Sequence, residues 1–197
     1  MAVAALVIFA FYVALATLRP LIVTRMRAGY WALRGAPGRG RLVGALLLLS
    51  WGVVSLGAIL DLNGQVDRIG ALDRSIVHAV GVVVAVAGLP LIVVAQATMA
   101  ASWRIGVDPD EKTELVTGGV FRFSRNPIHG GMVAMAVGVA LMVPNAVCVA
   151  AVALIVVAVE LQVRAIEEPY LRRVHGDVFT NWTATSGRFL PGIGTTR

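Results

Sequence analysis

The chain has 197 residues, of which 58% are hydrophobic and only 14% charged, and its mean hydropathy is +0.82. Soluble domains carry about 25% charged residues, whereas the charges here are confined to short stretches between long uncharged blocks. This patterning is typical of a polytopic membrane protein and leaves no room for a second large domain. The net charge is +6, but the arginines lie at the ends of apolar blocks, which suits lipid headgroups better than nucleic acid.

Five apolar segments follow one another along the chain. The first is uncharged over residues 2–18, with further apolar residues at 21–23, the second over 42–60 and the third over 76–101. The uncharged run 130–159 is too long for one span of roughly 20 residues, and Pro144-Asn145 marks a turn near its middle. We therefore expect an all-α membrane fold with five transmembrane helices, of which the last two form a tight hairpin over 130–143 and 146–164. Residues 1–101 would form a three-helix transmembrane region, and residues 102–197 a second region in which two polar stretches flank the hairpin.

The loop charges predict the orientation. The loop 19–41 has no acidic residue and holds six arginines: Arg19, Arg25, Arg27, Arg34, Arg39 and Arg41. Cytoplasmic loops are enriched in arginine and lysine, so this loop is expected in the cytoplasm and the mixed-charge loop 61–74 outside. Five crossings then place the amino terminus outside, and both long polar stretches, 102–129 and 165–197, in the cytoplasm.

Metal and hydrolytic chemistry find little support in the sequence. The three histidines lie far apart and have no partner at metal-ligand spacing. No serine sits in a nucleophile elbow, and the single cysteine, Cys148, lies in an apolar run. Gln96 and Glu160 lie close to or inside apolar runs, where polar groups are functional candidates, although both could simply reach the cytoplasmic interface.

Two stretches carry the functional signal. They contain LVTGGVF at 115–121, RNPIHGG at 125–131, EE at 167–168, HGDVFTNW at 175–182 and GRFLP at 187–191. Their order and spacing around an apolar hairpin resemble the membrane methyltransferase superfamily of isoprenylcysteine carboxyl methyltransferases and phospholipid N-methyltransferases. Asn126, His129, His175 and Gly187 depart from the commoner family residues, which are His, Tyr, Phe and Pro.

The resemblance implies S-adenosylmethionine as the cofactor. By it, Glu167 contacts the cofactor and Arg164 faces the methyl acceptor. The residue chemistry agrees: backbone at Leu115 and Val116 could pair with adenine, Phe121 could stack on a cation or ring, and Glu167 could accept from an amino group or ribose. The full set of predicted cofactor-binding residues is Leu115, Val116, Phe121, Arg125, Asn126, Pro127, Ile128, His129 and Glu167.

The predicted catalytic residues are Arg164 and Glu168. An ionised carboxylate acceptor, such as an isoprenoid or prenylcysteine-like acid, needs no general base and could be oriented by arginine. An amine or thiol would need a base, for which Glu168 and His129 are the nearby candidates. The acceptor would be a lipid or another lipophilic molecule that enters from the bilayer, and no metal or nucleic acid is expected.

Several alternatives remain open. Residues 125–127 could be an ordinary polar helix start, and Arg164 and Glu168 could form an i,i+4 ion pair at the end of a span. The carboxy-terminal region also looks similar to NADPH-dependent membrane sterol reductases, which have about twice as many spans. A non-catalytic scaffold or small transporter subunit is the third reading, although the ionisable residues cluster at one face rather than at the midplane.

Overall fold

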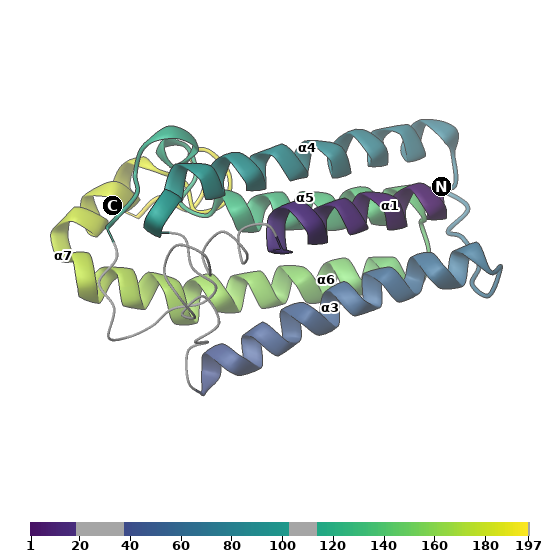
Figure 1. Cartoon of the computed structure of the whole chain (residues 1–197), viewed down its shortest axis with the longest axis horizontal. Coiled ribbons are helices and arrows are strands. Elements are labelled where there is room, and N and C mark those ends of the chain that lie inside the picture. Colours follow the sequence, from purple (N-terminus) through teal and green to yellow (C-terminus); the bar gives the residue numbers. More distant parts are fainter. Residues whose placement is uncertain (19–37, 103–113, 197) are drawn as a thin grey trace.

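The computed structural model describes residues 1–18, 38–102 and 114–196 (Figure 1). Within these ranges the chain is helical, with two isolated β-bridges and no β-strand. The α-helices are α1 (Ala2–Tyr12), α3 (Arg39–Leu62), α4 (Ser75–Met99), α5 (Pro127–Met142), α6 (Ala146–Gln162) and α7 (Glu168–Thr185). The shorter elements are the π-helical turns η1 (Val13–Leu18) and η5 (Val163–Glu167) and the 3-10 turns η3 (Ala100–Ser102) and η4 (Gly119–Arg122). The all-α prediction is confirmed for the described residues.

Three helices are long and apolar enough to cross a membrane by length and composition: Gly40–Leu62, Ser75–Met99 and Ala146–Thr185. Ala2–Ala16 and Pro127–Met142 are apolar but shorter. Thus all five predicted segments are helical, and spanning length is shown for three of them. At 16 residues, α5 rises about 24 Å, which is less than the roughly 30 Å of a hydrocarbon core.

The predicted hairpin turn is present between α5 and α6. Its central residue, Asn145, is fully buried, and its side-chain oxygen accepts a hydrogen bond from the backbone N–H of Cys148 at 2.9 Å. This is an N-cap, which satisfies one of the free N–H groups at the start of α6. The Asn145 amide donates to the carbonyl oxygen of Gly57 at 3.1 Å, so the turn is also fastened to α3.

Small residues let α4 and α5 approach closely. A Cβ atom added at Gly88 would lie 2.6 Å from the carbonyl oxygen of Gly131, and one added at Gly138 would lie 2.4 Å from the backbone nitrogen of Ala85. Lipid offers no hydrophobic drive for helix association, so membrane helices rely on such close backbone packing. The pairing of α4 with α5 fixes the position of the start of α5, where the functional signal of the sequence lies.

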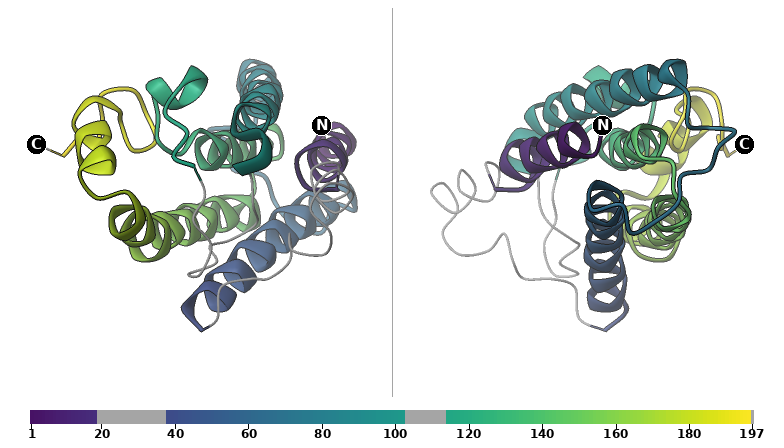
Figure 2. Two further views of the ribbon diagram at one scale, coloured as in Figure 1. Left: turned by 60° about the vertical axis from the view of Figure 1, so that its left-hand side comes forward. Right: turned by 90° about the vertical axis from the view of Figure 1, so that its right-hand side faces the viewer.

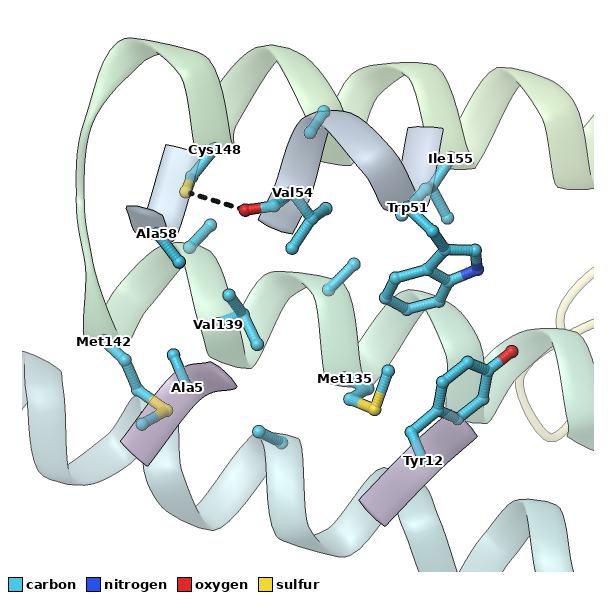
Figure 3. Packing of buried hydrophobic residues seen from close by; sticks show 14 of the residues in the cluster. Ala5, Tyr12, Trp51, Val54, Ala58, Met135, Val139, Met142, Cys148 and Ile155 are labelled. Carbon is cyan, nitrogen blue, oxygen red and sulfur yellow. Dashed lines mark hydrogen bonds between the residues drawn. The ribbon is translucent and has the colours of Figure 1, made fainter. Parts of the chain in front are cut away.

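The buried core runs along the centre of the bundle (Figure 3). One part of it is a cluster of aromatic rings from α1 and α3. The ring centroids of Tyr12 and Trp51 lie 4.9 Å apart, and those of Phe9 and Trp51 lie 5.5 Å apart in a stacked arrangement. Cys148 is fully buried in the same core, next to Val54. It therefore faces the neighbouring helix α3.

Gln96 differs from its expected role. It does not reach the interface but is buried, and its side-chain amide donates to the carbonyl oxygen of Ala16 at 2.7 Å. Ala16 belongs to the π-helical turn η1. A buried amide in an apolar helix needs such a partner, and here the partner comes from the amino-terminal helix.

The last helical element is longer than predicted. Instead of ending near residue 164, α6 continues through η5 into α7, so that helix extends without a break in assignment from Ala146 to Thr185. α7 is polar and lies beyond the apolar stretch, and Gly176 breaks its helical geometry with φ of 52°. The carboxy-terminal polar stretch is therefore a bent helix followed by a tail.

The two ends of the bundle differ in what they hold (Figure 1). The amino terminus lies at the same end as the loop 63–74, whereas the carboxy terminus lies at the opposite end with α7. At the loop end, Arg68 makes a double hydrogen bond to Asp61 at 2.7 and 2.9 Å and a further one to Asp73 at 3.2 Å. His78 lies 3.0 Å from the same Asp73 carboxylate.

Candidate active site

The candidate site lies at the end of the bundle that carries α7 and the carboxy-terminal tail. There the polar segment 114–126, the start of α5, the α6–α7 junction and the tail meet, as the views in Figures 1 and 2 show. Backbone hydrogen bonds join the two polar stretches, from Arg125 N to Gly187 O at 2.8 Å and from Asn126 N to Arg188 O at 3.1 Å. The two stretches that carry the sequence motifs are therefore side by side in space.

Gly187 has a structural reason to depart from the proline of the family pattern. A Cβ atom there would lie 1.9 Å from the carbonyl oxygen of Leu190, so the tail turn leaves no room for a side chain. The Gly187 N–H also donates to Phe123 O at 3.3 Å, and the residue forms a parallel bridge with Ser124. Proline has no N–H and could not make this bond.

An ionic cluster of Arg125, Glu168 and Arg188 holds these elements together. Arg188 makes two bonds to the Glu168 carboxylate at 2.8 and 3.0 Å, and Arg125 Nη2 donates to Glu168 Oε1 at 3.2 Å. The Arg125 side chain is 2% exposed, and those of Glu168 and Arg188 are 15% exposed. Arginine–carboxylate pairs of this double geometry are among the stronger polar contacts in proteins.

The cluster shifts the ionisation of its members. Burial opposes the charge on Glu168, but the hydrogen bonds from Arg188 and Arg125 outweigh it and hold the pKa of Glu168 below its ordinary value. Burial lowers the pKa of Arg125, against the bond to Glu168. The hydrogen bond to Glu168 raises the pKa of Arg188, against its partial burial. All three groups are charged at neutral pH, so Glu168 is a poor proton acceptor.

Arg125 also binds backbone carbonyl groups. Its Nη1 atom donates to Thr183 O at 3.3 Å and makes a short contact with Ser186 O, while Nη2 donates to Gly194 O at 3.0 Å. The terminal nitrogens of this predicted cofactor-binding residue are therefore occupied by the end of α7 and by the tail. Its Nε atom is buried without a partner among the described residues.

The π-helical turn η5 places Glu167 apart from Glu168. Glu167 Oε1 accepts a hydrogen bond from the Gln162 side chain at 3.0 Å, and His129 Nε2 lies 3.8 Å from the same oxygen. His129 and Glu167 are both partly buried. A predicted cofactor-binding residue of α5 is thereby brought next to one of the α6–α7 junction, 38 positions away in the sequence.

Arg164 lies outside this cluster. Its side chain is 58% exposed and forms an ion pair with Glu160 one helical turn earlier. The alternative i,i+4 pair of Arg164 with Glu168 is wrong, because Glu168 is bound by Arg125 and Arg188 instead. Among the described residues, this exposed pair is the ion pair that Arg164 makes, and such pairs contribute little to stability.

The start of α5 presents free backbone donors. Pro127 occupies the first helical turn, and Asn126 is the N-cap but makes no side-chain capping bond. Its amide donates instead to Arg188 O at 3.0 Å. The N–H groups of the first turn, at Ile128 and His129, are thus left without a side-chain cap, and such helix ends favour anionic groups.

The aromatic residue of the segment before α5 is buried and does not expose a ring face to solvent. Phe121 is buried, and its carbonyl oxygen accepts hydrogen bonds from Trp182 Nε1 at 3.3 Å and Ser186 Oγ at 3.1 Å. Leu115 and Val116 are half-buried in an irregular stretch that leads into η4. Residues 103–113, which form the first part of the predicted cytoplasmic stretch 102–129, lie outside the described ranges.

Sequence reasoning missed three contributors to this end of the molecule. Gln162, Arg188 and Ser186 were not singled out, although each binds a motif residue. Arg188 lies inside the GRFLP motif, so its motif position was a usable signal. Gln162 could have been noticed as an uncharged polar residue at the end of an apolar run.

Among the residues that the structure describes, no group of three His, Cys, Asp or Glu side chains is arranged to hold a metal ion. The groups at this end that could bind a ligand are the Glu167 carboxylate, the His129 imidazole and the backbone N–H donors at the start of α5. This set suits an organic molecule that carries both positive and negative groups.

Comparison with known proteins adds the family. No curated protein matches the chain. The model of the phospholipid methyltransferase family matches residues 76–178, which is more than half of the chain and includes α4 to α6, η5 and part of α7. The predicted resemblance is confirmed, and the chain belongs to the phospholipid methyltransferase family of membrane methyltransferases.

Proposed function

We propose that this protein transfers a methyl group from S-adenosylmethionine to a lipophilic acceptor at the cytoplasmic face of the membrane. One observation carries the proposal: Glu167, His129 and the uncapped start of α5 converge at one end of a bundle of apolar helices. A water-facing pocket and the bilayer would then adjoin. The family membership supports methyl transfer as the reaction class.

The available groups fit the polar parts of this cofactor. S-adenosylmethionine presents an amino group, a carboxylate and ribose hydroxyls, and its sulfonium supplies a methyl group that is already activated. Glu167 can accept from the amino group or from ribose. His129 and the first-turn N–H groups of α5 can hold the carboxylate. The side chains of Arg125 and Asn126 donate hydrogen bonds to backbone carbonyl groups of the tail, and so hold the tail against the start of α5.

Exposed charge supports the cytoplasmic placement of this end. Arg122 in η4 and Arg172 and Arg173 in α7 are exposed at the end of the bundle that carries α7. Arg41 is exposed near the start of α3, at the end of that helix that lies away from the loop 63–74. At the opposite end, Asp61 lies in the last turn of α3. The loop 63–74 that follows holds Asp67 and Asp73 together with two arginines. By the positive-inside rule the arginine-rich end faces the cytoplasm, with the amino terminus outside.

The ionisation state of Glu168 affects which class of methyl acceptor the site favours. Because both of its oxygens are bound by arginines and its pKa is lowered, Glu168 is a weak candidate for a general base. A carboxylate acceptor needs no base, and Arg164 at the α6–α7 junction, which is exposed and paired with Glu160, can orient it. We therefore favour O-methylation of a lipophilic acid such as an isoprenoid carboxylate.

A phospholipid amine is the second candidate, since the family is described by phospholipid methylation. An amine must lose a proton, and His129 beside Glu167 is then the base that the structure offers. Incubation of the purified protein with methyl-labelled S-adenosylmethionine and either farnesoic acid or phosphatidylethanolamine vesicles would separate the two. Label that appears as a base-labile ester supports the first, and label retained on the headgroup nitrogen supports the second.

Cofactor binding is tested by titrating S-adenosylhomocysteine into the detergent-purified protein in a calorimeter. Loss of a hydrogen bond to a charged group costs about 1.5–3 kcal/mol, so Glu167→Gln should weaken binding by about tenfold or more. Asp177→Asn makes the same chemical change at an exposed position of α7 and should leave binding unchanged. Failure of the unmodified protein to bind, or its preference for NADPH, would contradict the proposal and favour a reductase.

A further inference from the structure

Gln162 is an unusual residue for its place. It is the last residue of the apolar helix α6 and is only 7% exposed, yet it carries a side-chain amide. Burial of an amide without a partner is costly. Its partner is the Glu167 carboxylate, since Gln162 Nε2 donates a hydrogen bond to Glu167 Oε1 at 3.0 Å.

This contact exists because the helix changes type. Gln162 and Glu167 are five residues apart, and in a regular α-helix of 3.6 residues per turn such positions point about 140° away from each other. The π-helical turn η5 spans Val163–Glu167, and π-helical geometry brings residues i and i+5 together. The turn thus serves to stack the Gln162 amide against the Glu167 carboxylate.

The bond fixes which oxygen of Glu167 is available. Gln162 and His129 both lie against Oε1, at 3.0 and 3.8 Å. Within the described residues, no hydrogen bond is made to Oε2 of Glu167, and the side chain is 23% exposed. One carboxylate oxygen is therefore held by the protein, while the other is left for a ligand.

We propose that Gln162 is a positioning residue that holds Glu167 in the rotamer needed to bind the positively charged amino group of the cofactor. This inference rests on the proposed function, since it assigns Gln162 a role in the same site. Gln162 touches Glu167 and acts through it. Its removal should weaken cofactor binding without changing the reacting groups.

The test exploits the direction of the hydrogen bond. Gln162→Glu places a second carboxylate against Glu167, and at pH 7.5 two acceptors cannot bond and repel each other. At about pH 5 the pair shares a proton, because neighbouring carboxylates raise the pKa of one member, and the donated bond is restored. The nearly isosteric Gln162→Met lacks a donor at every pH.

Binding of S-adenosylhomocysteine is measured for each variant relative to the unmodified protein at the same pH, so that any pH dependence of the unmodified site cancels. We expect Gln162→Glu to bind about tenfold more weakly at pH 7.5, and within about threefold of the unmodified protein at pH 5. Gln162→Met should remain about tenfold weaker at both pH values. In turnover assays, KM for the cofactor should rise while kcat changes little.

Gln96→Glu is the matched control. Gln96 is the other buried glutamine, also 7% exposed, but it donates to a backbone carbonyl of η1 rather than to Glu167. Any general effect of a buried acid on folding appears in both variants, whereas recovery of ligand binding in acid is expected only for position 162. Equal binding by Gln162→Met and the unmodified protein would overturn the inference, and so would equal weakening of Gln162→Glu at both pH values. Absence of binding by the unmodified protein would instead refute the proposed function.

Discussion

The two ends of the bundle use the same chemistry for different purposes. At the loop end, Arg68 joins Asp61 and Asp73, which lie seven and five residues away in the sequence. At the site end, Arg125 joins Glu168, 43 residues away, and three carbonyl groups still further along the chain. The loop-end arginine is 33% exposed and the site-end arginine 2%.

The loop-end and site-end clusters therefore contribute differently to the fold. The loop-end cluster closes one short connection, which is also attached to the hairpin turn by the bond from Ile69 N to Pro144 O. The site-end cluster assembles the polar segment before α5, α7 and the tail around Glu167 and His129. Loss of the first should loosen a loop, and loss of the second should dismantle the site.

The largest effect is expected from Arg125→Met. Removal of one partner of a buried charge pair costs about 3–5 kcal/mol, and here Glu168 and the carbonyl oxygens of Thr183 and Gly194 lose a donor as well. The tail should detach, which proteolysis after residue 186 would detect, and S-adenosylhomocysteine binding should be lost. A tail that stays protected in this variant would show that the cluster does not hold it.

An intermediate effect is expected from acid. The pKa of Glu168 is below its ordinary value in the folded protein, so its contribution to stability is complete above the unfolded-state value of about 4.5. That contribution is lost as the pH falls from there through the lowered pKa. Thermal unfolding in detergent between pH 6 and 3 should show a falling midpoint, and Glu168→Gln should have a lower midpoint at pH 6 and a flatter dependence. A parallel slope in the variant would place the acid sensitivity elsewhere.

The smallest effect is expected from Arg68→Met at the loop end. Because this arginine is one-third exposed, solvent screens much of its interaction, and we expect a loss of about 1 kcal/mol. S-adenosylhomocysteine binding should remain within about twofold of the unmodified protein, since the loop lies at the opposite end of the bundle. A binding defect as large as that of Arg125→Met would mean that the two ends are coupled through the helices.

The sequence predicted the elements better than their ends. Uncharged runs locate all five apolar helices, because lipid excludes charge and favours helices that satisfy their own backbone. Pro144-Asn145 located the hairpin turn, since this cap is a local interaction. The helical character of residues 168–185 was missed, because its polar residues carry no apolar run. The start of α5 at Pro127 lies before the uncharged run and was recognised from the proline itself.

The site was predicted as a neighbourhood rather than as a set of roles. Motif order placed Glu167 and His129 in the same region, and the structure brings them within 3.8 Å. The partner of Glu168 could not be read from spacing, because Arg164 stands four residues before it and Arg125 forty-three. The π-helical turn decides this by rotating Glu167 toward Gln162 and leaving Glu168 to face Arg125 and Arg188.

The apolar helices, the hairpin and the family could thus be predicted, because they follow from composition and from local order along the chain. Which charges are structural and which remain available for binding follows instead from the folded chain. That choice depends on the change of helix type at η5 and on contacts between residues far apart in the chain, such as Arg125 with the tail. Periodicity within one segment reports which face of a helix is apolar, but neither a π-helical turn nor a distant partner.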